Sequence, residues 1–421
     1  MKYAITMLLV GCTFATAYGS CGTARAGPYS VEIVAQAGDV IDGRTIVGFS
    51  GEQLSVKINN SGEVAFFADF SSGFFVNLGL LTQNRFIAGA GKVIDGRATF
   101  FGSEPYLDMN NQGDVVYQAV WDFETGIFVN ETLLVQAGVT VIDGYTVSNL
   151  SGSPGINDAG TVLFNANTLE FAGVFTLSEV VIRNGQSFDG FTIRNAGGIP
   201  NNAGKVAFGA NFKEFEGLAI ATFSDGILVK EGDAIDDVTI DRIRHVGFTD
   251  AGELYMNILG TDISGEADGY IVTTNQILFG PESTLTDVPD PSLTGNGVVM
   301  NNAGQLAFRG TVDAPGFNDG RFDDKRMFFS AAGEVVISEG DMLDGKVVHR
   351  VSTTFDMNSH GDVVFGVTFE DLSKAVVVGT PVIPEPSSAA LAAMGVLFLL
   401  AARGTQSSAR ECRARNEEVM R

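Results

Sequence analysis

The stretch Asn59-Asn60-Ser61-Gly62-Glu63-Val64-Ala65-Phe66 carries the pattern that decides the fold, N-x-x-G-x-(V/L)-x-(F/Y). Asparagine suits the start of a turn because its side chain can bond to the backbone two residues on. Glycine tolerates a positive φ where the turn enters a strand. The apolar residues that alternate after the glycine are typical of a β-strand. We therefore interpret the pattern as a turn followed by a strand.

The pattern recurs along the chain at nearly constant spacing. Its glycines are Gly62, Gly113, Gly160, Gly204, Gly252, Gly304 and Gly361, so the units are 44 to 57 residues long. Five further copies begin at Asn110, Asn157, Asn201, Asn301 and Asn358, and a changed copy runs from Thr249 to Tyr255. A fixed period in this range is the signature of a repeat architecture.

A second motif runs out of phase with the first and consists of an apolar strand, a glycine and then (I/L/F)-D-G. Its aspartates are Asp42, Asp95, Asp143, Asp189 and Asp344, with the variant Asp236-Asp237 and a Pro-rich loop, Pro281 to Pro291, where another copy is expected. We interpret these residues as turn formers. The alternative is Ca²⁺ binding, which needs six to eight converging oxygens; no D-x-D-x-D loop supports it.

Each unit is predicted to contain four strands. In the unit around Gly160 we expect strands at Tyr145–Leu150, Thr161–Asn165, Gly173–Leu177 and Glu179–Arg183. Seven four-stranded units of this length predict an all-β fold, a seven-bladed β-propeller over residues 27–380. Another β-repeat fold or a solenoid is the alternative.

The phase of the repeat predicts a closed ring. Val31–Gln36 matches Leu133–Gln136, which is the fourth strand of its unit. The last unit supplies three strands, at Val347–Val351, Asp362–Val367 and Lys374–Val378, and then stops. We expect the N-terminal strand to complete the last blade, because this pairing removes two exposed strand edges.

The composition disfavours nucleic acid as a partner and indicates what stabilises the predicted domain. The chain has 421 residues and a net charge of −24, which disfavours nucleic acid as a partner because phosphate binding needs a basic surface. Its three cysteines, Cys12, Cys21 and Cys412, all lie in the terminal segments. The predicted domain therefore has no disulfide and depends on a large apolar core.

The N-terminal residues 1–26 have the pattern of a secretory signal peptide. Lys2 is followed by the apolar run Ala4–Ala17 and by Ala24-Arg25-Ala26, which predicts cleavage between Ala26 and Gly27. Lipoprotein processing at Cys12 and a buried first element are the alternatives.

The C-terminal residues 381–421 carry a second export pattern. Pro384-Glu385-Pro386 precedes the apolar run 389–402, which is shorter than the roughly 20 residues of a full membrane span. Arg403 and a basic tail, 403–421, follow. This order resembles the PEP-CTERM sorting signal of Gram-negative bacteria. The resemblance implies an exosortase-type processing enzyme as partner, transient membrane anchoring through 389–402, and display on the outer surface or in the extracellular matrix.

The repeat itself is similar to the NxxGxxxAF tandem repeat of exported bacterial proteins, over roughly residues 30 to 380. That resemblance implies that the chain is exported, and it identifies no catalytic residues.

Candidate site residues are few. There are three histidines, His245, His349 and His360, and no zinc-binding pair, G-x-S-x-G elbow or P-loop is present. The first strands of a propeller approach its axis, so a basic group near the channel mouth is a candidate site for an anionic sugar, set against the more common pairing of such charges with neighbouring acids. The basic group comprises Arg242, Arg244, His245, His349 and Arg350. The acidic insertion Asp319–Lys325 is interpreted as a solvated loop, with a cation or partner site as alternative.

These observations predict an exported, non-catalytic propeller that binds a polysaccharide or an envelope protein, or that serves as a structural coat. No cofactor is expected, although Ca²⁺ stays open. The alternative is a polysaccharide hydrolase or lyase at the channel mouth, which requires carboxylates converging within about 5–10 Å.

Overall fold

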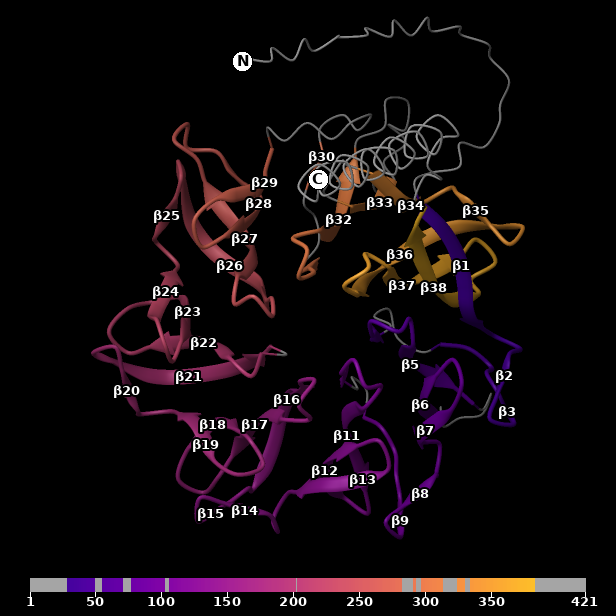
Figure 1. Ribbon diagram of the computed structural model, residues 1–421, viewed down its shortest axis with the longest axis horizontal. Coiled ribbons are helices and arrows are strands. Elements are labelled where there is room, and N and C mark those ends of the chain that lie inside the picture. Colours follow the sequence, from indigo (N-terminus) through magenta and orange to yellow (C-terminus); the bar gives the residue numbers. More distant parts are fainter. Residues whose placement is uncertain are drawn as a thin grey trace, which may run out of the picture.

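The computed structural model describes residues 29–49, 55–70, 77–102, 106–201, 203–281, 291–292, 297–312, 324–329 and 334–382. These residues form strands and turns, with no helix among them. Antiparallel sheets follow one another in chain order around a common centre (Figure 1). The predicted all-β propeller is confirmed, while the count of seven blades remains a prediction.

Most units contain a four-stranded antiparallel sheet whose strands follow the chain order. The first three sheets are β4 (Val56–Ile58), β5 (Val64–Asp69), β6 (Leu78–Thr82) and β7 (Phe86–Gly89); β10 (Leu107–Met109), β11 (Val115–Trp121), β12 (Glu124–Val129) and β13 (Thr132–Gln136); and β16 (Asn149–Ile156), β17 (Val162–Asn167), β18 (Ala172–Phe175) and β19 (Val180–Arg183). The next two are β21 (Phe191–Pro200), β22 (Val206–Phe212), β23 (Leu218–Thr222) and β24 (Gly226–Lys230); and β26 (Val238–Phe248), β27 (Leu254–Thr261), β28 (Ala267–Thr273) and β29 (Ile277–Phe279).

The following sheet has a divided first strand, because β30 (Pro291–Ser292) and β31 (Val298–Met300) both pair with β32 (Leu306–Val312). Strands β33 (Asp324–Phe329) and β34 (Glu334–Ser338) complete it. The Pro-rich loop and the acidic insertion that interrupt this unit lie largely outside the described residues.

Short hairpins precede the first strands. They are β2 (Val40–Ile41) with β3 (Arg44–Thr45), β8 (Val93–Ile94) with β9 (Arg97–Ala98), β14 (Val141–Ile142) with β15 (Tyr145–Thr146), and β20 (Ser187–Phe188), β25 (Ala234–Ile235) and β35 (Met342–Leu343) against the starts of β21, β26 and β36 (Lys346–Met357).

The hairpins correct one predicted element. A first strand at Tyr145–Leu150 was wrong, because the first strand β16 begins at Asn149 and Tyr145 belongs to a hairpin. Asp143 and Gly144 at the tip have φ values of 50° and 82°. Two successive positive φ angles define a type I′ turn, which Asp-Gly favours and which folds Tyr145 directly back onto Ile142.

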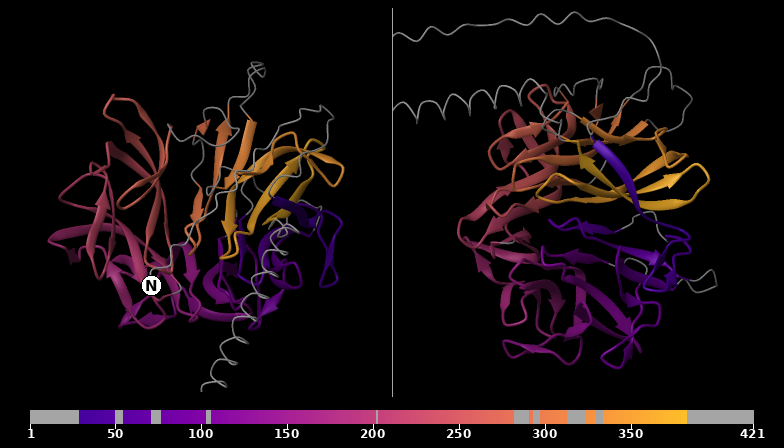
Figure 2. Two further views of the ribbon diagram at one scale, coloured as in Figure 1. Left: turned by 45° about the horizontal axis from the view of Figure 1, so that its top comes forward. Right: turned by 45° about the vertical axis from the view of Figure 1, so that its right-hand side comes forward.

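The predicted closing strand is confirmed. β1 (Tyr29–Gln36) pairs antiparallel with β38 (Lys374–Pro381), with Val31 opposite Gly379 and Gln36 opposite Ala375. β38 in turn pairs with β37 (Val363–Phe369), and β37 with β36. The indigo β1 therefore lies against the yellow C-terminal strands (Figure 1 and Figure 2).

The apolar cores lie between neighbouring sheets. Phenylalanine dominates their fully buried side chains, among them Phe66, Phe128, Phe175, Phe208, Phe212, Phe308, Phe365 and Phe369. One cluster joins the chain ends: Ala35 of β1 and Val376 of β38 pack with Phe66 of the first unit. Buried phenylalanines therefore contribute much of the core between neighbouring sheets.

Candidate axial binding site

The N-x-x-G turns position the site, because each first strand ends directly before one of them. The Asn59 side-chain oxygen accepts hydrogen bonds from the backbone N–H groups of Ser61 (3.0 Å) and Glu63 (2.9 Å). Gly62 has a φ of 80°, which is the left-handed region that favours glycine. The predicted role of this motif in turns is confirmed.

The same asparagines also join neighbouring units. Asn110 Nδ2 donates to the Asn157 carbonyl oxygen at 3.2 Å, and Asn301 Nδ2 donates to that of Asn358 at 3.1 Å. Asn201 donates in the same way to Thr249, at 2.9 Å. Sequence reasoning missed this second role, because a turn pattern is local and the acceptor lies about one repeat away.

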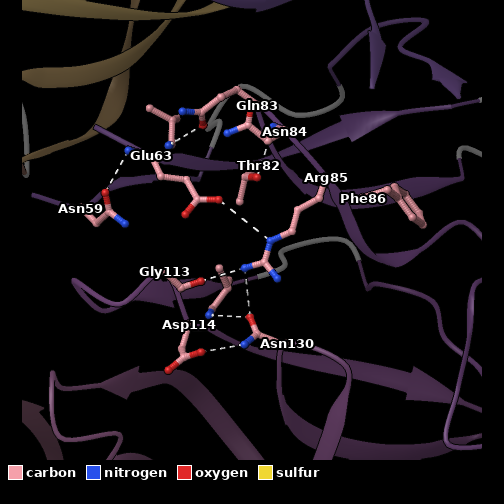
Figure 3. A network of polar contacts seen from close by, with 12 residues as sticks. Asn59, Glu63, Thr82, Gln83, Asn84, Arg85, Phe86, Gly113, Asp114 and Asn130 are labelled. Carbon is pink, nitrogen blue, oxygen red and sulfur yellow. Dashed lines mark hydrogen bonds and ion pairs between the residues drawn. The ribbon is translucent and has the colours of Figure 1, made fainter. Parts of the chain in front are cut away.

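Longer side chains add to these links between the turns of neighbouring units. Arg85, in the turn between β6 and β7, donates to the Gly113 carbonyl oxygen at 2.8 Å and lies 3.9 Å from a Glu63 carboxylate oxygen (Figure 3). Asn130 binds the Asp114 carboxylate at 2.8 Å in the same network. One turn is thus held by both its own unit and the preceding one.

A cavity of about 870 Å³ lies where the first strands end. Its lining comes from β4, β10, β16, β21, β26, β31 and β36 and from the turns after them. Consecutive members of this set contact one another, and β36 contacts β4, so the strands surround the cavity. A volume of this size is typical of a site for a small molecule or a short polymer segment.

One position in each unit, two residues before the N-x-x-G motif, decides the character of the cavity; we call it the axial position. Its occupants are Lys57, Asp108, Gly155, Ile199, Gly247, Val299 and Asp356. The charged residues are thus confined to three units that follow one another across the ring closure, and the remaining four units have glycine or an aliphatic residue there.

The three charged axial residues form an ionic group. Lys57 Nζ lies 3.3 Å from Asp108 Oδ1 and 3.8 Å from Asp356 Oδ1. The second oxygen of each aspartate accepts a backbone N–H from the next unit: Asp356 from Ile58 at 3.1 Å and Asp108 from Ile156 at 3.0 Å. The carboxylates are therefore fixed in place, and the ammonium lies between them.

Burial and charge shift the protonation equilibria of this group. The Asp356 carboxylate raises the pKa of the Lys57 ammonium above its usual range, with a smaller contribution from Asp108. Burial raises the pKa of the Asp356 carboxyl, although Lys57 and the Ile58 N–H oppose that effect. Lys57 is consequently a cation at neutral pH.

His245 and Tyr255 complete the titratable groups of the lining. Burial, with a smaller contribution from the charge of Lys57, lowers the pKa of the His245 imidazole to about 4, so this side chain is neutral at pH 7. Burial raises the pKa of Tyr255 to about 12. Tyr255 lies opposite Gly247 in the β26–β27 pair, and its ring fills the space that a side chain at Gly247 would need.

The predicted basic group is not gathered in the cavity. His245 is part of the lining, whereas Arg242 and Arg244 on β26 and His349 and Arg350 on β36 are exposed and are not part of it. β26 and β36 are long strands whose last residues reach the cavity, so residues nearer their starts lie further out. β31 separates the two strands in the ring.

The D-G aspartates lie apart from one another in separate hairpins. The Asp143 carboxylate accepts the N–H of Val180 at 2.8 Å, and Asp95 accepts that of Leu133 at 3.2 Å, each in the last strand of the next sheet. Among the residues that the structure describes, no group of three or more His, Cys, Asp or Glu side chains is placed to hold a metal ion. These geometries confirm turn formation by the aspartates.

The export patterns lie outside the described residues, namely Ala26 and Gly27 at the predicted cleavage site, the Pro384-Glu385-Pro386 motif, the apolar run 389–402 and Arg403. Within the ranges that are described, no helix has both the length and the apolar character needed to cross a membrane.

No protein-family model and no curated protein matches the chain. Among solved structures, the β-propeller domain of the trilobed protease from Pyrococcus furiosus matches 77% of this chain and 94% of its own, at 12% identity and a TM-score of 0.45. The polysaccharide lyase Uly1 matches 84% and 99%, at 9% identity and a TM-score of 0.42. Virginiamycin B lyase from Staphylococcus aureus matches 84% and 100%, at 8% identity and a TM-score of 0.35. At these scores the matches say nothing about ligand or activity.

The fold and the cavity define an all-β propeller with a polar axial site.

Proposed function

We propose that this chain is an exported binding protein of the bacterial envelope or extracellular matrix, a seven-bladed propeller that holds a segment of polysaccharide in its axial cavity. The cavity carries this proposal: it is large, surrounded by strand ends and lined by amides, hydroxyls and a few charges. Such a mixture of apolar surface with a few placed polar groups is what ligand sites present.

Seven blades are supported by the contacts around the cavity. Each first strand contacts the next one, and the ring of contacts returns from β36 to β4. Apolar clusters likewise continue between sheets up to the seam, where Ala35 and Val376 pack against Phe66. Export is supported by the two terminal sequence patterns, 1–26 and 381–421.

Binding without turnover is the function that the ionic group favours. In paired-acid glycosidases, one carboxyl donates a proton to the glycosidic oxygen and the other acts as nucleophile or base. Here Lys57 lies between Asp108 and Asp356, where the scissile bond would have to lie. The remaining oxygens of both aspartates are engaged by backbone N–H groups.

One observation favours a hydrolase or lyase as the second candidate. Asp108 Oδ1 lies 3.3 Å and Asp356 Oδ1 lies 3.8 Å from Lys57 Nζ. The distance between these two carboxylate oxygens therefore cannot exceed the sum of the two values. That limit falls inside the spacing of roughly 5–10 Å found in glycosidases. Tyr255 and His245 in the same cavity add groups that can transfer protons.

The test is titration of the purified full chain with extracted exopolysaccharide, followed by calorimetry, with product release measured in parallel. Saturable binding without new reducing ends or unsaturated products is expected. Turnover that disappears in Asp356→Asn would show that the protein is an enzyme and would contradict the proposal of binding without catalysis. Absence of both binding and turnover would leave a structural coat, which self-association at high concentration would reveal.

A further inference from the structure

The charged groups of the cavity lining do not balance. Among the described lining residues, the carboxylates are Asp108, Asp250 and Asp356, and the only fixed cation is Lys57. His245 adds no charge at neutral pH, because burial keeps its pKa at about 4. The cavity therefore carries an excess of negative charge within a chain whose net charge is already −24.

That excess decides which ligands the cavity favours. A cleft lined by one sign of charge focuses the field and concentrates ions of the opposite sign. An anionic sugar would enter against this field, and the exposed basic residues of β26 and β36 lie outside the lining. A ligand that carries an ammonium group would instead find carboxylate oxygens that still have acceptor capacity, since each carboxylate can accept about four hydrogen bonds.

The cavity lining also offers apolar surface on which a sugar ring can pack. Gly155, Gly247 and Val299 occupy the axial position in their units and carry no polar side chain. Pro200 packs over Gly155 and the Tyr255 ring covers Gly247, which gives flat apolar surfaces. Aromatic and apolar faces of this kind combine with amides and hydroxyls in sites for amphipathic ligands.

Amide groups also belong to the lining of the cavity. Asn60, Asn111 and Asn302, each the second residue of its N-x-x-G turn, belong to the lining. Their side-chain oxygens accept backbone N–H groups from the neighbouring unit, as in Asn60 with Ser359 and Asn111 with Asn60, both within 2.9 Å. Amides that are held in this way are fixed in orientation and can read the hydroxyl pattern of a ligand.

We propose that the axial cavity selects a polysaccharide segment that bears free amino groups, a polymer of the hexosamine class, with the ammonium bound beside Asp108 and Asp356. This inference rests on the proposed function and specifies its ligand class. The Lys57 ammonium then competes with the ammonium of the ligand, because it occupies the position between the two carboxylates.

The experiment compares four hexasaccharides on the full chain by calorimetry: glucosamine, N-acetylglucosamine, glucose and a uronic acid. At slightly acid pH the glucosamine hexamer is expected to bind at least about tenfold more tightly than the N-acetylated one, since only it forms charge-assisted hydrogen bonds. Asp108→Asn should weaken that binding about tenfold, and by clearly more than it weakens binding of the glucose hexamer. Lys57→Gln should strengthen it, a change that damage to the fold would not produce.

Asp143→Asn is the matched control, because it makes the same change of charge in an outer hairpin and should leave all affinities unchanged. Equal binding of the two hexosamine polymers, or tighter binding of the uronic acid, would overturn the selectivity and leave the binding function standing. If none of the four binds, the hexosamine proposal fails, and the titration with extracted exopolysaccharide decides separately whether the binding function stands. A loss of affinity in Lys57→Gln, with the unfolding temperature retained, would overturn the role of Lys57 as competitor.

Discussion

Asn358 Nδ2 donates a hydrogen bond to the carbonyl oxygen of Asn59 at 3.2 Å, across 299 residues of sequence. It is the same bond that Asn110 makes to Asn157 within the chain. The seam between the last and first units is therefore bonded in the same way as the boundaries that Asn110, Asn201 and Asn301 span. Ring closure rests on this polar link as well as on the β1–β38 pairing.

Removing the Asn358 side chain should destabilise the fold strongly. Its oxygen accepts the N–H groups of His360 and Asp362, both at 3.0 Å, so Asn358→Ala leaves several buried polar groups without partners. We expect a loss of about 2–3 kcal/mol in the free energy of unfolding, measured by urea denaturation. His360→Ala is the control, since that side chain is exposed in the same turn. Equal stability of the two variants would contradict the role given to Asn358.

The closing strand gives a second prediction. Ala35 of β1 is fully buried in the seam cluster, so Ala35→Asp places a charge among apolar side chains. A cost of about 3 kcal/mol or more is expected, because a buried unpaired charge is among the most destabilising changes. Glu32→Ala on the exposed face of the same strand should change stability by less than about 0.5 kcal/mol. If Ala35→Asp is equally harmless, β1 does not close the ring in solution.

The fold could be predicted from the sequence because its determinants are local. An asparagine and a glycine three residues later fix a turn, Asp-Gly fixes a hairpin, and both repeat often enough to reveal the period. The phase of Val31–Gln36 within that period even predicted the closing strand. The error at Tyr145 arose where two short strands, β14 and β15, precede the first strand of the unit.

The site could not be predicted in the same way, because its residues meet only in the closed ring. Lys57, Asp108 and Asp356 belong to three units, and each looks like an ordinary strand residue within its own. β4 and β10 are three residues long, too short for a clear periodicity. A signal was nevertheless present: alignment of the units on their asparagines places all three charges in one column.

The hairpin aspartates distinguish turn formation from calcium binding. Asp143 has a φ of 50°, a conformation that asparagine also tolerates and that costs alanine roughly 1–2 kcal/mol. Asp143→Ala should therefore lower the free energy of unfolding by about that amount, while Asp143→Asn should be nearly neutral. Calcium should leave the unfolding temperature of the wild-type chain unchanged. A calcium-dependent rise that Asp143→Asn abolishes would show that the carboxylate is a metal ligand.

His245 should make the protein sensitive to acid. Its pKa is about 4 in the folded state against 6.5 for an unperturbed histidine, so the unfolded chain takes up a proton first as the pH falls. Stability contributed by the neutral imidazole is therefore complete above about pH 6.5 and is lost progressively toward pH 4. His245→Gln removes this titration, and its free energy of unfolding should fall less than that of the wild type between roughly pH 7 and pH 4.5.

The other titratable groups near His245 do not cause the expected difference in acid sensitivity between the wild type and His245→Gln. Lys57 and Tyr255 stay protonated throughout the window, because their pKa values are raised. Asp356 acts in the opposite direction: burial raises the pKa of its carboxyl, so the folded state takes up that proton first and gains stability on acidification. Both proteins keep Asp356, so its effect largely cancels when the two denaturation series are compared. Parallel loss of stability in wild type and His245→Gln would mean that the imidazole is solvated and that the cavity wall around it is open to water.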